Sequence, residues 1–172
     1  DKLVILAKRA IESSKLLDEN KNLKELVTPD IDLIGNSHFI NNTKKNIESF
    51  SKSNSRLLIE GPFGVGKKLI ANQIHKSSKY SNKIPINIDF ASLNENNLEV
   101  LFSEDVKNLN DNLFIRSNMN TLILSNIDLI PLKFQKQFLF FIENEDFFKS
   151  SNIVLDHKII TISEKNLEEE IE

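Results

Sequence analysis

Three of the four glycines in this 172-residue chain fall within six residues, directly after the short apolar run 57–59. The stretch consists of Gly61, Pro62, Phe63, Gly64, Val65, Gly66, Lys67 and Lys68. It satisfies the pattern G-x-x-x-x-G-K, in which backbone amides and the N-terminus of a following helix surround phosphate oxygens. Lys67 is then expected to reach the β- and γ-phosphates of a nucleotide. The Ser or Thr that normally completes the pattern is replaced by Lys68, so the loop predicts phosphate binding but departs at its last position.

The elements that must hold this loop alternate along the chain. Residues 56–60, 84–90, 121–124 and 157–162 have the composition of strands, and residues 37–51, 67–80, 93–102 and those after Pro131 have helical spacing. Strands separated by helix-sized crossovers indicate a parallel sheet with helices on both faces. The predicted fold is therefore a three-layer α/β domain of the P-loop type over residues 33–172, with the loop between its first strand and the next helix.

Residues 3–27 have helical periodicity over about seven turns without Gly or Pro. Leu16, Asn20, Leu23 and Val27 fit the seam of a two-stranded coiled coil, in which a buried Asn fixes the register. A single helix packed on its own domain explains the same pattern. Residues 28–30, which include Pro29, mark the boundary, so the chain divides into a linker helix (1–28) and the α/β domain (33–172).

Composition excludes several classes of protein. The chain is 40% hydrophobic and 27% charged, which excludes a wholly disordered chain, and its longest apolar run, 138–142, is too short to cross a membrane. It has no cysteine, which excludes disulfides and zinc–thiolate sites and fits a cytoplasmic protein. A net charge of −3 argues against direct nucleic-acid contact. Because the chain starts with Asp1 and stops in a charged run, we expect it to be a piece of a longer protein.

Beyond the loop, several stretches resemble the central AAA+ domain of NtrC-type response regulators. They are residues 33–37, 55–62, 64–67, 74–75, 121–124, 128–132 with Gln135, and 158–160 with 166–167. Residues 1–27, through the stretches 1–4 and 10–12, are similar to the last receiver helix and linker helix of the NtrX branch. The resemblance implies that Ile34 and Gly35 belong to the adenine pocket. It also implies ATP or ADP as ligand, while leaving open whether Mg²⁺ accompanies the nucleotide.

The residues that the resemblance assigns to catalysis are missing. Its two Walker B carboxylate positions fall on Ser125 and Asn126, which neither hold a metal as carboxylates nor act as a base at neutral pH. Its sensor I asparagine position is Glu164. Its strand-end Glu–Asn pair falls on Asn126 and Asp89, with the residue types exchanged, and we expect these two side chains to hydrogen-bond. No catalytic residue and no metal ligand is predicted.

Two further absences concern motifs of related domains. Residues 103–113 leave no room for the GAFTGA loop with which related domains grip sigma-54, and the NtrX branch commonly lacks that loop too. No arginine follows Arg116, but the resemblance places the arginine fingers of the family beyond residue 172. The expected function is a nucleotide-binding, ATPase-inactive relay module that dimerises through residues 3–27. The resemblance places it between a receiver domain, phosphorylated by a histidine kinase, and a DNA-binding domain. Two alternatives stay open: an active ATPase that uses Asp128 or Asp89 as a substitute acid, and a scaffold that binds no nucleotide.

The remaining chemically suggestive residues have plainer explanations. His38, His75 and His157 lack metal-ligand spacing and are expected on helix surfaces or at strand ends. The phenylalanine-rich stretch 138–141 is expected in the core. The lysine pair 44–45, like Lys67-Lys68, is too isolated to form a nucleic-acid patch.

Overall fold

The computed structural model describes residues 15, 32–103, 111–144 and 154–169 of the chain. Its contacts group the residues from Leu33 onward into one compact unit, separate from those before it. The helix and coiled coil predicted for residues 3–27 lie, Lys15 excepted, outside the described residues and stay predictions. None of the described helices combines the length and the apolar character that crossing a bilayer requires.

The sheet has four parallel strands in the order β1-β4-β3-β2. They are β1 (Leu57–Glu60), β2 (Ile86–Asp89), β3 (Thr121–Ser125) and β4 (Lys158–Ser163). The central strand β3 is buried along its whole length because helices cover both of its faces. This double burial explains why its sequence is a continuous apolar run rather than an alternating one. All four predicted strands are confirmed, each with its ends within two residues of those expected.

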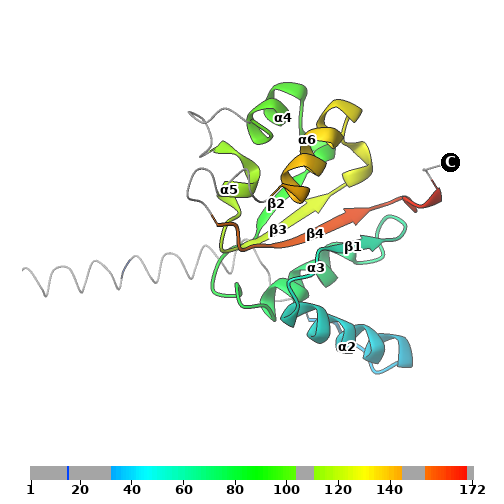
Figure 1. The fold of residues 1–172 in the computed structure, drawn as a ribbon. Coiled ribbons are helices and arrows are strands. Elements are labelled where there is room, and N and C mark those ends of the chain that lie inside the picture. Colours follow the sequence, from blue (N-terminus) through cyan, green and yellow to red (C-terminus); the bar gives the residue numbers. More distant parts are fainter. Residues whose placement is uncertain (1–14, 16–31, 104–110, 145–153, 170–172) are drawn as a thin grey trace, which may run out of the picture. The chain divides into compact units, whose positions relative to one another are not determined.

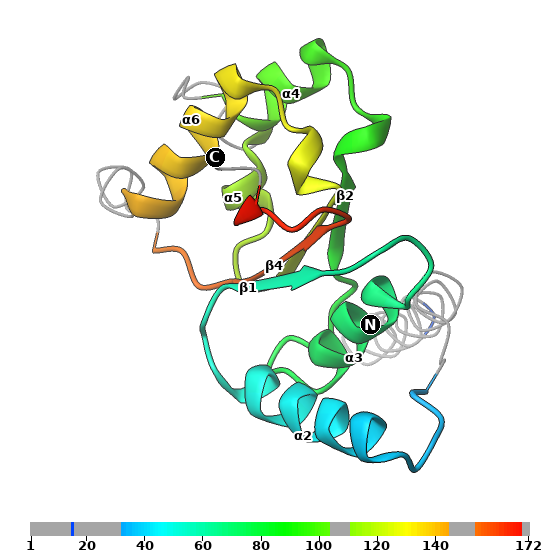
Figure 2. The same ribbon diagram turned by 90° about the vertical axis from the view of Figure 1, so that its right-hand side faces the viewer.

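Two groups of helices cover the two faces of the sheet (Figures 1 and 2). Helices α2 (His38–Lys52) and α3 (Lys67–Lys76) lie on one face. Helices α4 (Glu95–Leu101), α5 (Leu113–Arg116) and α6 (Leu132–Glu143) lie on the other. The predicted three-layer α/β arrangement is therefore confirmed. Only α5, a single turn capped by the side chain of the preceding residue, was not predicted.

Alternate residues of β3 supply the two cores. Leu122 and Leu124 belong to the larger core, on the side of α4, α5 and α6, whereas Ile123 belongs to the smaller core with Ala71 and Ile74 of α3. This alternation is the period-two geometry of a strand. The sheet is thus fixed from both sides, and its strand ends are held in register at the edge where the glycine loop lies.

Phenylalanines dominate the larger core. The Phe114 and Phe141 ring centroids lie 5.4 Å apart, and those of Phe102 and Phe134 lie 6.0 Å apart. Within the stretch predicted as core, Phe141 is buried and Phe138 and Phe140 pack against the cluster. Leu139 in the same stretch is 53% exposed, so the prediction fails at that one position. Its place on the outer face of α6 explains the failure.

Helices α3 and α4 and strand β2 are shorter than expected, and local contacts explain where α3 and β2 end. Helix α3 ends at Lys76 rather than continuing to residue 80, because the Ser78 amide turns back to donate to the His75 carbonyl at 3.0 Å. Strand β2 stops at Asp89, whose carboxylate accepts from the Ala91 amide and starts the 3-10 turn η1 (Phe90–Ser92). A second such turn, η3 (Ile127–Leu129), follows β3.

The prediction for His75 was wrong. This side chain is only 3% exposed, although it was expected on a helix surface. Its Nδ1 lies 2.8 Å from Thr121 Oγ1 and its Nε2 lies 2.9 Å from the Lys83 carbonyl oxygen. Both ring nitrogens have partners, which is what makes burial of an imidazole tolerable. His75 therefore ties α3 to β3 and has a structural position.

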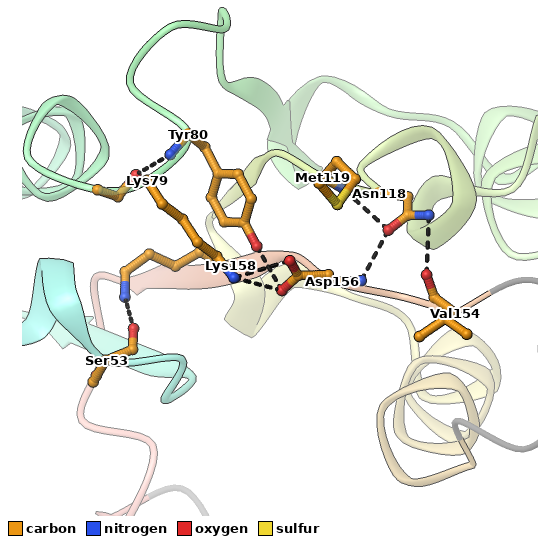
Figure 3. A network of polar contacts seen from close by, with 9 residues as sticks. Ser53, Lys79, Tyr80, Asn118, Met119, Val154, Asp156 and Lys158 are labelled. Carbon is orange, nitrogen blue, oxygen red and sulfur yellow. Dashed lines mark hydrogen bonds and ion pairs between the residues drawn. The ribbon is translucent and has the colours of Figure 1, made fainter.

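Polar contacts connect the elements at the edge where β4 begins (Figure 3). Buried Lys158 donates to the Phe50 carbonyl at 2.5 Å and to the Ser53 carbonyl at 2.7 Å, at the end of α2. Asp156 accepts from the Lys79 ammonium at 2.8 Å and from the Tyr80 hydroxyl at 2.7 Å. These bonds join residues 76 to 108 positions apart and fix the end of the sheet opposite the glycine loop.

Candidate nucleotide-binding site

The glycine loop joins the end of β1 to the start of α3, which is the context that a phosphate loop requires. Gly64 has φ 82° and Gly66, the residue before α3, has φ 91°. An added Cβ would meet nothing within 4 Å at either position, so the backbone conformation, rather than space, is what calls for glycine. The loop places amides and the first turn of α3 around one concave surface.

Lys67 is held inside the loop. It is 8% exposed, and its Nζ donates to the Gly61 carbonyl at 2.6 Å and the Pro62 carbonyl at 2.8 Å. These bonds brace the loop from within and keep one positive charge at its centre. A phosphate that enters the loop competes with the two carbonyl oxygens for this ammonium group.

A cavity of about 340 Å³ lies between the loop and the carboxyl ends of β2, β3 and β4. Its lining residues are Phe63, Gly64, Gly66, Lys67, Lys68, Asp89, Ser125, Asn126, Ile162 and Glu164. Ligands of open parallel sheets bind at this edge. A cavity of about 390 Å³ near Arg56 and His157 lies at the opposite edge, where there is no glycine loop, so we place the candidate site in the smaller cavity.

The predicted site residues divide into three groups. Five of them line the cavity, namely Phe63, Gly64, Gly66, Lys67 and Lys68. Gly61, Pro62 and Val65 belong to the same loop without lining it. Ile34 and Gly35, predicted for the base, are not brought to the cavity: Ile34 is 88% exposed, and the Gly35 carbonyl accepts from Lys44 Nζ at 3.1 Å. Their contact with a base stays a prediction.

The ends of β2 and β3 meet through Asp89 and Asn126. Asn126 Nδ2 donates to Asp89 Oδ1 at 2.6 Å, so the predicted hydrogen bond is confirmed. Asn126 has φ 56° in the left-handed region, which asparagine adopts more readily than most residues. Register explains the contact, because Asp89 lies directly beside Ser125 in the sheet.

Lys68 completes this cluster from the first turn of α3. Its Nζ lies 3.1 Å from Asp89 Oδ2. Burial raises the pKa of Asp89, but hydrogen bonds from Asn126, Lys68 and the Ala91 amide, with the Lys68 charge, bring its pKa below the ordinary value. Asp89 is therefore an ionised carboxylate with each oxygen already accepting a hydrogen bond.

The two other acidic side chains considered at sequence level lie differently. Asp128, in η3, accepts from the buried Ser163 hydroxyl at 3.2 Å and is not among the residues that line the cavity. Glu164 does line it, directly after β4. Sequence reasoning missed Ile162, although its place at the carboxyl end of a predicted strand was a usable signal.

Metal binding finds little support in these residues. Across the described part of the chain, no group of three or more His, Asp and Glu side chains is placed to hold a metal ion. Ser125, 5% exposed at the end of β3, contributes a hydroxyl and Asn126 an amide where a P-loop NTPase has carboxylates.

A parallel sheet with a glycine loop at its carboxyl edge and helices on both faces defines a P-loop α/β domain of the AAA+ type. The Sigma-54 interaction domain family matches residues 33–172, and the chain belongs to that family. A response regulator of Rickettsia felis described as NtrX-like is 36% identical over 178 residues. The nitrogen assimilation regulatory protein NtrX of Azorhizobium caulinodans is 30% identical over 178 residues.

Solved structures agree with these sequence relatives. NtrX from Brucella abortus in complex with ATP superposes with a TM-score of 0.77 at 25% identity, covering 99% of this chain and 40% of that one. Its complex with ADP gives a TM-score of 0.75 at 26% identity, covering 99% and 37%. The alignments with the Rickettsia felis and Azorhizobium caulinodans proteins include 99% of this chain but only 38% and 39% of those proteins. This chain therefore spans about two fifths of their length.

Proposed function

We propose that this domain binds ATP or ADP in the cavity beside the glycine loop and does not hydrolyse it. The observation that carries the proposal is the combination of a phosphate loop that keeps its glycines and Lys67 with Ser125 and Asn126 at the end of β3. The Brucella abortus NtrX complexes with ATP and ADP support nucleotide binding by a domain of this fold.

Loss of hydrolysis follows from the chemistry of the lining residues. A positioned base contributes about 10²–10⁴ to a rate, and neither a serine nor an asparagine replaces it. Asp89 is hydrogen-bonded to Lys68 and Asn126, and Asp128 is hydrogen-bonded to Ser163 away from the cavity lining. These contacts argue against either aspartate as a substitute acid, and so against the active-ATPase alternative.

Within a longer NtrX-like regulator, we place the domain as a relay between a receiver and a DNA-binding domain. Residues 3–27 would dimerise it, and phosphorylation of the receiver by a histidine kinase would change the geometry of that dimer. The interval 104–110, where the GAFTGA loop would fall, lies outside the described residues. The short distance in sequence between Ser103 and Leu113 supports a domain unable to remodel sigma-54 holoenzyme. Such a regulator acts in the cytoplasm.

Nucleotide binding and turnover are tested together. Titration of a fluorescent ADP analogue should give saturable binding by the parent and by Lys45→Ala, an exposed control on α2. Lys67→Ala should lose this binding, because it removes the ammonium group at the centre of the loop. Phosphate release from ATP should be equal in parent and Lys67→Ala preparations. Release by the parent above that background would overturn the proposed inactivity, and absence of binding would favour the scaffold alternative.

Dimerisation needs a separate measurement. Sedimentation equilibrium of the chain should show a dimer, and a Leu16→Glu/Leu23→Glu variant should sediment as a monomer, because charges at the predicted seam oppose pairing. If the parent chain sediments as a monomer, the proposed coiled coil is wrong, whereas the proposed nucleotide binding is unaffected.

A further inference from the structure

The cavity is a poor site for Mg²⁺, which is the ion that P-loop NTPases use. In that class the metal is held by the Ser or Thr that follows the loop lysine and by an Asp at the end of the neighbouring strand. Here those positions are Lys68 and, at the end of β3, Ser125 and Asn126. Mg²⁺ prefers carboxylate and phosphate oxygens in octahedral geometry. A lysine, a hydroxyl and an amide do not fit it.

Neither carboxylate of the cavity repairs this loss. Asp89 Oδ1 accepts from Asn126 Nδ2 and the Ala91 amide, and its Oδ2 pairs with Lys68 at 3.1 Å. A metal ion at Asp89 would have to displace the Lys68 ammonium or lie beside it, and two cations at that separation repel. Glu164, the second carboxylate that lines the cavity, lies directly after β4, and among the described residues it belongs to no group of three or more His, Asp and Glu side chains placed to hold a metal ion.

Lys68 is well placed to act on phosphate itself. It is the second residue of α3, next to Lys67, and it lines the same cavity as Gly64 and Gly66. Its side chain is 64% exposed on a flexible stem, so the ammonium group can turn from Asp89 toward an anion in the loop. Two consecutive lysines and the helix N-terminus then provide the positive charge that faces the phosphates.

We infer that this site takes its nucleotide as the metal-free anion, and that the Lys68 ammonium supplies beside the phosphates the charge that Mg²⁺ supplies elsewhere. The inference rests on the proposed nucleotide binding and adds the chemical form of the ligand. It gives Lys68 a binding role that the glycine-loop pattern does not assign.

The test is a titration of ADP in EDTA and again in excess MgCl₂. Parent protein should bind ADP in EDTA. Its apparent affinity for ADP should fall in MgCl₂, because Mg²⁺ binds ADP in solution and lowers the concentration of metal-free ADP. Lys68→Gln should lose about tenfold or more of the affinity in EDTA, the lower end of what a charge-assisted hydrogen bond contributes. Lys76→Gln, which changes a lysine at the far end of the same helix, should match the parent.

The outcomes separate the inference from the function on which it rests. Absence of ADP binding in both buffers overturns the proposed function. Binding that is about tenfold tighter in MgCl₂ leaves the function standing and overturns the metal-free inference. Lys68→Glu provides a second variant, whose far-ultraviolet circular dichroism shows whether it is folded. If folded Lys68→Gln and Lys68→Glu both bind ADP in EDTA as the parent does, Lys68 has no role in binding.

Discussion

Replacement of Lys158 by methionine should destabilise the domain. Lys158 begins β4, at the end of the sheet opposite the cavity. Lys158 is 2% exposed, and its ammonium group donates to the Phe50 carbonyl at the end of α2. It also donates to the Ser53 carbonyl (Figure 3). Methionine fills a similar volume but donates no hydrogen bond. The substitution therefore leaves two carbonyl oxygens at the helix end without their charged donor.

The size of the effect follows from two opposing contributions. A hydrogen bond to a charged group contributes about 1.5–3 kcal/mol, so two bonds set an upper bound of about 3–6 kcal/mol. Burial of an ammonium ion opposes this gain by several kcal/mol. Burial, followed by the positive charge of Lys79, lowers the pKa of Lys158, which is the direction that this opposing contribution requires. We expect a net loss of about 2 kcal/mol, or a fall in Tm of about 4–8 °C.

Urea unfolding followed by circular dichroism measures this loss. The control is Lys79→Met, which removes a nearby but half-exposed lysine and should change the midpoint less. The pH dependence gives a second check. Because the folded-state pKa of Lys158 is lowered, the unfolded chain binds more protons at alkaline pH, so parent stability should rise with pH between the folded and ordinary lysine values. A Lys158→Met variant as stable as the parent, or more stable, would refute the reasoning.

Three further results are expected. Gly66→Ala should lose about 1–2 kcal/mol in urea unfolding, because φ is 91° at this position, and an unchanged midpoint would contradict the strain argument. Glu164→Gln should raise ATP affinity relative to ADP in competition titrations, because it removes a negative charge from the cavity, and an equal ratio in parent and variant would place Glu164 away from the terminal phosphate. Asp156→Asn should weaken the dependence of the free energy of unfolding on pH in the acid range. Hydrogen bonds from Lys79 and then Tyr80 lower the pKa of Asp156, so parent stability should fall as the pH drops from the ordinary aspartate value through this lowered one, and urea midpoints over that range measure it.

The strands and the phosphate loop were predictable because their signals are local. Strand β3 is buried on both faces, so every residue from Leu122 to Leu124 is apolar and the run stands out in the sequence. The glycine loop was equally predictable, because Gly64 and Gly66 adopt backbone angles that other residues rarely adopt. Local constraints of this kind restrict which residue types can occur, so the sequence alone indicates them.

Other features depended on partners far away in the chain. His75 has the polarity of a surface residue, and its burial depends on oxygen partners that include the Thr121 hydroxyl, 46 positions later, and the Lys83 carbonyl. Helix α5 is four residues long and has no periodicity to detect; it rests on the Asn112 cap and on the burial of Phe114. Ile34 was assigned to the adenine pocket by resemblance alone; it is 88% exposed, and its contact with a base stays a prediction.

The pair at the ends of β2 and β3 shows how the strand-end contact and the proposed loss of hydrolysis are compatible. A hydrogen bond between neighbouring strands requires one donor and one acceptor, and it does not matter which strand supplies which. Asn126 as donor and Asp89 as acceptor therefore satisfy the sheet as well as the opposite arrangement would. For chemistry the exchange matters, because the carboxylate moves from the end of β3, where P-loop NTPases position metal and water, to the end of β2. There it faces Lys68, which neutralises it. Under the proposed function, the site loses hydrolysis because its negative charge has changed position and gained a partner, while the contact that holds the strand ends together is kept.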